Sequence, residues 1–143
     1  MRRTSGSAFL LGAALGLLLW PRPLSAQACK DEESMLAFYK KDLAEMVETV
    51  KKESLLAFEK AYHQKSSLSR LALYGTNVDS LLSCLDKAAQ DTTATKEQVE
   101  AYKAKRESYA KLKGKIQQDR NALKAAEAPK DAKALIEKFD LGG

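Results

Sequence analysis

The chain has 143 residues, of which 30% are charged and 7% aromatic, and a formal net charge of +5 at pH 7. This length fits one small domain and no more. One histidine and two distant cysteines cannot supply the four ligands of a zinc site or the Cys-x-x-Cys-His sequence of an attached haem.

The first 28 residues have the three-part layout of a secretory signal peptide. Arg2 and Arg3 precede an apolar run over residues 8–19, and the segment closes on Ala26-Gln27-Ala28. The apolar run would give roughly 18 Å of helix, too short for a hydrocarbon core of about 30 Å. We therefore predict a signal peptide over residues 1–28, cleaved after Ala28 or alternatively after Ala26. The protein would be exported, to the periplasm or cell envelope of a bacterium, or otherwise secreted.

The remaining chain has the composition of long, uninterrupted helices. Its net charge falls to +2, because the signal segment holds three basic residues and no acidic one. Before Gly142 it contains two glycines, Gly75 and Gly114, and its one proline is Pro129. Such scarcity of helix breakers predicts an all-α fold. Separately, we expect no transmembrane span in the mature chain.

The first predicted helix covers about residues 31–65. Its large apolar residues recur at helical spacing, and no strand-like alternation competes with this pattern. They are Leu36, Tyr39, Leu43, Met46, Val47, Val50, Phe58, Ala61 and Tyr62. The serine-rich stretch at Lys65–Ser69 is the first candidate turn, and Tyr74–Asn77 is the second. A second helix is expected over residues 67–90, with a break at Gly75 as an alternative.

The clearest loop runs from Gln90 to Ala94. After it, Thr95 and Gln98 have the spacing of a capping box that opens a helix over residues 96–127. Pro129 begins a last helix over residues 130–139, and residues 141–143 should fray. We therefore expect residues 29–140 to form an elongated helical hairpin or a three-helix bundle with antiparallel, coiled-coil-like packing. Few bulky apolar groups are available for its core, which favours self-association.

Cys29 and Cys84 leave three interpretations open. Two cysteines in an exported domain commonly form one intramolecular disulfide. With a first turn at Ser66, however, antiparallel packing places them about 28 Å out of step, and only a turn near Leu56 would align them. The alternatives are pairing between chains or free thiols, and lipid attachment at Cys29.

The lipid interpretation rests on four residues. Ala26-Gln27-Ala28-Cys29 resembles the bacterial lipoprotein arrangement, in which a cysteine follows the signal directly. The family pattern has a leucine-like residue where this chain has Ala26, and a small residue in place of Gln27. The resemblance implies an envelope lipoprotein anchored through Cys29.

No residue pattern in the chain indicates catalysis. His63, the only histidine, is interpreted as a surface residue near a helix end. Acids such as Glu48 and Glu107 have a lysine four residues on, the spacing of solvated ion pairs on a helix. We therefore predict no enzyme activity, no catalytic residues, no metal and no cofactor.

Charge is distributed unevenly between the predicted helices. Residues 96–124 carry a net charge of +5, whereas residues 29–91 carry −2. The candidate basic face consists of Lys103, Lys105, Arg106, Lys111, Lys113, Lys115 and Arg120. It either attracts an anionic envelope surface or packs its charges against the acidic first helix and solvent. Nucleic acid is not an expected partner, because the net charge is small.

We therefore expect a small cell-envelope protein that acts as a helical interaction or structural module, binding a protein partner or its own copy. In its export signal, size, lysine-rich helices and thin core, the chain over residues 35–125 also resembles the periplasmic Skp/OmpH-type chaperones. That resemblance implies a holdase whose arms grip unfolded clients. The small β-strand assembly body of that family has no counterpart in this sequence.

Overall fold

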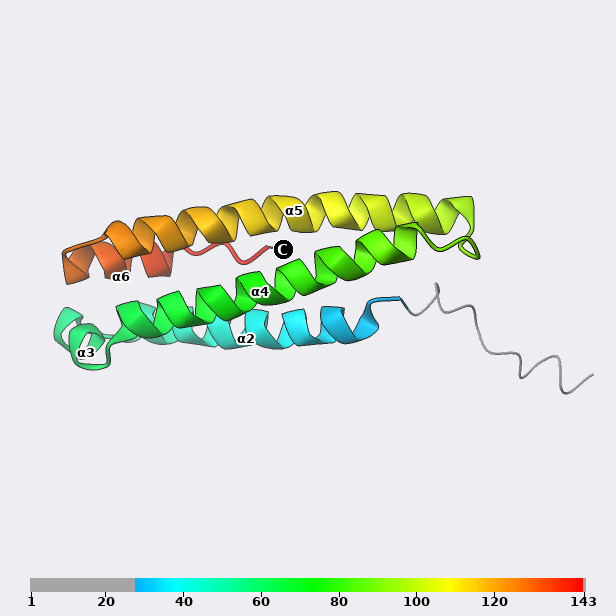
Figure 1. The fold of residues 1–143 in the computed structure, drawn as a ribbon. Coiled ribbons are helices and arrows are strands. Elements are labelled where there is room, and N and C mark those ends of the chain that lie inside the picture. Colours follow the sequence, from blue (N-terminus) through cyan, green and yellow to red (C-terminus); the bar gives the residue numbers. More distant parts are fainter. Residues whose placement is uncertain (1–27, 143) are drawn as a thin grey trace, which may run out of the picture.

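The structure is a computed structural model that describes residues 28–142. This range folds entirely into helices and connecting segments, which confirms the all-α prediction. The predicted signal peptide lies outside the described residues except for Ala28. The helices, labelled in Figure 1, are α2 (Lys30–Lys52), α3 (Leu55–Lys60), α4 (His63–Ala89), α5 (Lys96–Ala125) and α6 (Pro129–Glu137).

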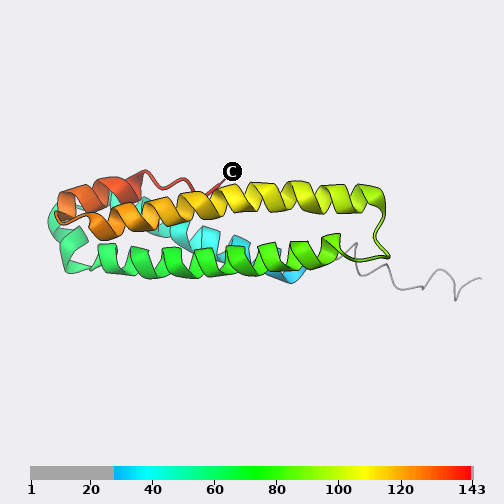
Figure 2. The same ribbon diagram turned by 45° about the horizontal axis from the view of Figure 1, so that its top comes forward.

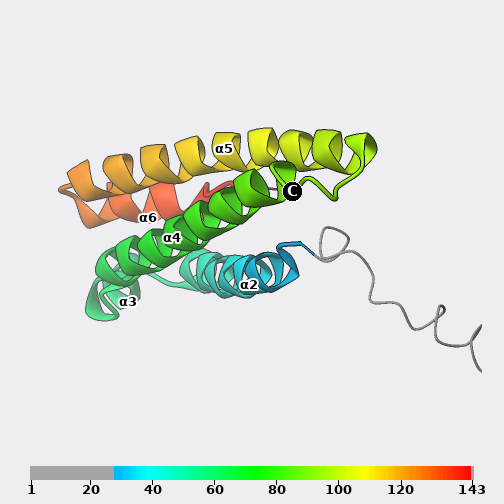
Figure 3. The ribbon, with the colours of Figure 1, turned by 45° about the vertical axis from the view of Figure 1, so that its right-hand side comes forward.

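Helix α4 lies between α2 and α5 and packs against both (Figures 1 and 3). The chain reverses direction through the α3 region, in the loop after α4 and again before α6, so neighbouring long helices are antiparallel (Figure 1). Helix α6 turns back beside the C-terminal half of α5 and also contacts α2, α3 and α4 (Figure 2). The resulting helical bundle is elongated. Helix α3 lies at one end, and the loop between α4 and α5 lies at the other.

The core follows a stripe along α4, which touches all the other helices. Its large residues recur three or four positions apart and are at most 1% exposed. They are Leu71, Tyr74, Val78, Leu81 and Leu85. Helix α5 buries only Tyr102, Ile116 and Leu123. Helix α6 adds the fully buried Ala132 and Ile136, so it thickens a core that two long arms alone would leave thin.

The first turn lies earlier than the sequence predicted. Helix α2 ends at Lys52, so a straight helix over residues 31–65 is wrong. Glu53 has an extended backbone, and the hydroxyl of Ser54 caps α3 by accepting a hydrogen bond from the Ala57 amide at 3.2 Å. A serine at the N-cap satisfies an orphan amide and starts a new helix without glycine or proline.

Neither predicted turn exists, because α4 runs without a break through Lys65–Ser69 and Gly75. The hydroxyls of Ser67, Ser69 and Thr76 donate hydrogen bonds to the carbonyl four residues earlier. This local bonding lets serine and threonine remain inside a helix. The serine cluster therefore did not indicate a turn.

The local signals after α4 were predicted correctly. The loop spans residues 90–95, and Thr95 and Gln98 form both bonds of a capping box. Pro129 occupies the first position of α6, where its missing amide costs nothing. Among the described residues, no helix combines the length and apolarity needed to cross a membrane.

Candidate functional site

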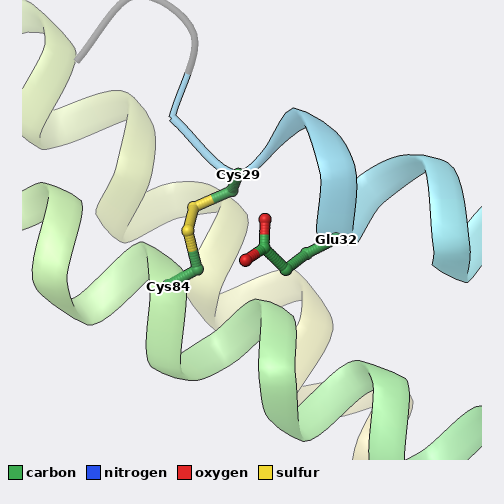
Figure 4. A group of neighbouring side chains, drawn as sticks. All are labelled: Cys29, Glu32 and Cys84. Carbon is green, nitrogen blue, oxygen red and sulfur yellow. A yellow bond between two sulfur atoms is a disulfide. The ribbon is translucent and has the colours of Figure 1, made fainter. Parts of the chain in front are cut away.

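The two cysteines join the start of α2 to α4 (Figure 4). Their sulfur atoms lie 2.12 Å apart and their Cα atoms 5.8 Å apart, so the pair forms a disulfide within the chain. The misplaced turn explains why the sequence argued against this pairing. Helix α3 is centred close to Leu56, the position that brings Cys29 level with Cys84 across an antiparallel pair.

Glu32 lies beside this disulfide, and Figure 4 shows its carboxylate directed towards the two sulfurs. A carboxylate oxygen and both sulfur atoms lie within 4.8 Å of one another. Each sulfur is already bonded to the other, however, and a metal would require thiolates. In the disulfide form, the cluster therefore offers a cation only the carboxylate of Glu32.

The predicted basic residues of α5 mostly meet acids from other elements. Four of them make ion pairs that connect α5 to α2, to α4 and to the C-terminal tail. These pairs are Lys105–Glu33, Arg106–Asp86, Lys113–Asp79 and Lys115–Asp140. The hydrogen bond that Lys105 donates to Glu33 raises the pKa of Lys105, and the hydrogen bond that Lys115 donates to Asp140 lowers the pKa of Asp140.

The other three basic residues stay on the surface of α5. Lys103 and Lys111 pair with acids one turn away, at 3.4 and 3.0 Å, and Arg120 makes no ion pair within the described range. Most of the positive charge on α5 is therefore paired with acidic residues of the same chain. Attraction of an anionic surface by this face stays a prediction.

His63 is not a surface residue, contrary to the sequence interpretation. Its side chain is 16% exposed, and its ring lies 5.8 Å from that of Phe58. Its Nε2 atom lies 2.7 Å from Oε2 of Glu53, and neither buried atom has another hydrogen-bond partner within the described residues. His63 therefore ties the start of α4 to the end of α2 across the turn.

Three large apolar side chains around α3 are exposed to solvent. Leu55, Leu56 and Tyr62 are 41%, 60% and 75% exposed, and we call these three residues the corner surface. The sequence pattern placed Tyr62 in the core, which is wrong. Tyr62 precedes α4 with φ 54°, a left-handed conformation that is unusual for a bulky residue. Phe58 already occupies the inner face of α3. The consecutive leucines Leu55 and Leu56 were therefore a usable sequence signal for an exposed apolar surface.

A hollow of about 400 Å³ adjoins the corner surface. Phe58, Tyr62, Leu68 and Pro129 line it, so α3, α4 and α6 all contribute. Gln64 also lines it, and its side-chain amide donates hydrogen bonds to two carbonyls at the end of α5, at 2.9 and 2.8 Å. These bonds satisfy groups that a helix end leaves unpaired and fix α5 against the start of α4.

The C-terminal tail lies in a groove between α2 and α5. The Tyr74 hydroxyl donates a hydrogen bond to the Leu141 carbonyl at 2.8 Å, and burial raises the pKa of Tyr74 to about 12. Leu141 is therefore hydrogen-bonded to α4, and Gly143 lies outside the described residues, so fraying of residues 141–143 stays a prediction. A cavity of about 460 Å³ extends the groove past the tail, lined by residues that include Leu36, Tyr109 and Leu112.

Comparison with known proteins adds no relative: no family model, curated protein or solved structure matches the chain.

Proposed function

We propose that this protein is an exported, non-catalytic interaction module that recognises its partner with the corner surface. The observation that carries this proposal is the contrast between a well-anchored turn and its uncovered apolar side chains. Phe58 is 2% exposed and His63 is tied to Glu53, whereas Leu55, Leu56 and Tyr62 face solvent. Clustered exposed apolar groups on a fixed frame are typical of recognition surfaces.

The disulfide supports export. Disulfides persist in oxidising compartments and are rare where thiols are kept reduced. The N-terminal segment with signal-peptide layout indicates the same compartment, with cleavage close to Cys29. Lipid attachment competes with this arrangement, because the sulfur of Cys29 cannot bond both a lipid and Cys84. We therefore favour a disulfide-closed protein over a lipoprotein anchored through Cys29.

The arrangement of the helices supports binding by a fixed surface. In this proposal, an elongated three-helix bundle consists of α2, α4 and α5. Helix α6 fills the groove between α2 and α5. A holdase of the kind suggested by composition needs open arms that close around a client. Here the C-terminal segment occupies that space, so we propose binding through an exposed surface and not client gripping.

Photo-crosslinking in the source cells tests the proposal. A photoreactive residue replaces Leu56 of the corner surface, and in a matched variant it replaces Phe38, which is 64% exposed on α2. We expect discrete adducts from position 56 that are absent from position 38, in protein recovered outside the cytosol. Equal labelling from both positions, or recovery of the chain only from the cytosol, would contradict the proposal.

A further inference from the structure

We infer that the corner surface docks onto an anionic lipid surface, with its apolar side chains entering the headgroup region and its lysines contacting the headgroups. This inference rests on the proposed function and names the partner of the same site. It follows from where the exposed apolar residues lie, which lysines surround them and how those lysines are paired.

Half of the exposed large apolar residues lie at one end of the molecule. Among the described residues, six large apolar side chains are clearly exposed, and three of these form the corner surface. Helix α3 lies at the end of the bundle, beside the turn between α5 and α6 (Figures 1 and 3), so its exposed residues can meet a flat surface that approaches this end. Leucine and tyrosine suit this role, because aliphatic groups enter the acyl boundary and tyrosine prefers the headgroup level.

The surrounding lysines differ from the basic residues of α5. Residues 51–65 contain four lysines and two glutamates, and one glutamate, Glu53, faces His63. Lys60 and Lys65 are exposed and make no ion pair with any described residue, whereas Lys51 and Lys52 interact with Glu48 of α2. Unpaired lysines beside apolar groups can extend their charged ends towards lipid phosphates while their stems cover apolar surface.

This charge arrangement favours a lipid surface over a second copy of the chain. Two corner surfaces brought together would oppose like-charged lysines, which costs affinity. An anionic headgroup layer presents charge complementary to both Lys60 and Lys65. Glu59 is the acidic residue of α3, so removing its charge tests the sign of the proposed electrostatic attraction.

Vesicle flotation with the disulfide-bonded exported chain tests the inference. Vesicles of phosphatidylcholine with phosphatidylglycerol are compared with vesicles of phosphatidylcholine alone. We expect binding to the anionic vesicles, weakened by salt, and at most trace binding to the neutral ones. Replacing both corner leucines, L55S with L56S, should lower the affinity by about tenfold or more. The matched control, F38S, should bind as the unchanged protein does.

Charge substitutions at the corner supply the second readout. Glu59→Gln removes the opposing charge and should raise the affinity for anionic vesicles by about threefold to fivefold. Lys60→Gln should lower it by a similar factor. Since these residues are exposed, circular dichroism should show unchanged folding, and the affinity changes then report on the surface alone.

Three results would overturn the inference: equal binding to neutral vesicles, equal loss with F38S, or reduced binding with Glu59→Gln. A protein adduct from position 56 without vesicle binding would also overturn it and would leave the proposed function intact. Absence of both vesicle binding and position-specific adducts would remove the proposed function as well.

Discussion

At each end of the bundle, a residue with a left-handed backbone conformation precedes a long helix, but the two residues are held in different ways. Cys29 precedes α2 with φ 68°, and Tyr62 precedes α4 with φ 54°. At the first end, a disulfide holds the left-handed residue and buries it to 5% exposure. At the second, packing of Phe58 and His63 holds the turn from inside and leaves Tyr62 uncovered. One end is therefore closed by a covalent bond, whereas the other leaves apolar side chains exposed, and it is to this second end that we assign contact with a partner.

The largest expected effect breaks the closed end. Cys84→Ser opens a loop of 55 residues, and the entropy of closing such a loop corresponds to up to about 4 kcal/mol of unfolding free energy. Urea denaturation of the oxidised protein and the variant measures this difference. Reductant should lower the stability of the unchanged protein towards that of the variant. A difference below about 0.5 kcal/mol would show that the disulfide does not restrain the unfolded chain as described.

Loss of the helix caps near the two ends should lower stability less than loss of the disulfide, and by different amounts at the two ends. Thr95→Ala removes a hydroxyl that takes part in a reciprocal capping box and should cost about 1–2 kcal/mol. Ser54→Ala removes a single cap bond at the corner and should cost about 0.5–1 kcal/mol. Thermal unfolding of both variants measures the pair. The reverse order would indicate that the corner depends on Ser54 more than its one bond implies.

Substitution of the left-handed residues should change stability in opposite directions at the two ends. Tyr62→Asn places a residue that tolerates positive φ at an exposed position and should raise the unfolding free energy by up to about 1 kcal/mol. Cys29→Asn suits the same φ but removes the disulfide, so it should lower stability. Chemical denaturation of both variants tests this. Destabilisation by Tyr62→Asn would mean that the tyrosine ring packs more than its exposure shows.

The last effect concerns Tyr74, midway between the ends, and is confined to alkaline pH. Its pKa is raised by burial from 10.0 to about 12, so the folded state keeps a proton that the unfolded state loses. Its contribution to stability is therefore complete below pH 10 and is lost as the pH rises towards about 12. Denaturation across this window should show a shallower decline for Tyr74→Phe than for the unchanged protein. Identical slopes would contradict a buried, protonated Tyr74.

Local signals in the sequence were sufficient for part of the fold. The capping box at Thr95, the loop before it and Pro129 at the start of α6 depend on neighbouring residues, and each was predicted correctly. The corner was missed because Glu53 and Ser54 break the helix without glycine or proline. A non-local signal existed: assuming a disulfide would have required a turn near Leu56, midway between the cysteines.

The candidate site was harder to predict than the fold. Helical spacing assigned Tyr62 to the core, because that pattern assumes one continuous helix, and a break before it rotates the residue outward. The charge excess of α5 was visible in the sequence. Its partners were not, since Glu33, Asp86 and Asp140 meet it only through tertiary packing. The lack of ion-pair partners for the lysines at the corner surface also depends on tertiary packing.

Peptide mapping of the protein recovered from the source cells, without reduction, tests the central claim most directly. The central claim is that the protein is a helical bundle located outside the cytosol and closed by its own disulfide at the end opposite the corner surface. Mass spectrometry should find one monomer, an N-terminus close to Cys29, and a peptide containing Cys29 linked to one containing Cys84. Free thiols on an uncleaved chain, a diacylated Cys29 or a disulfide-linked dimer would contradict it.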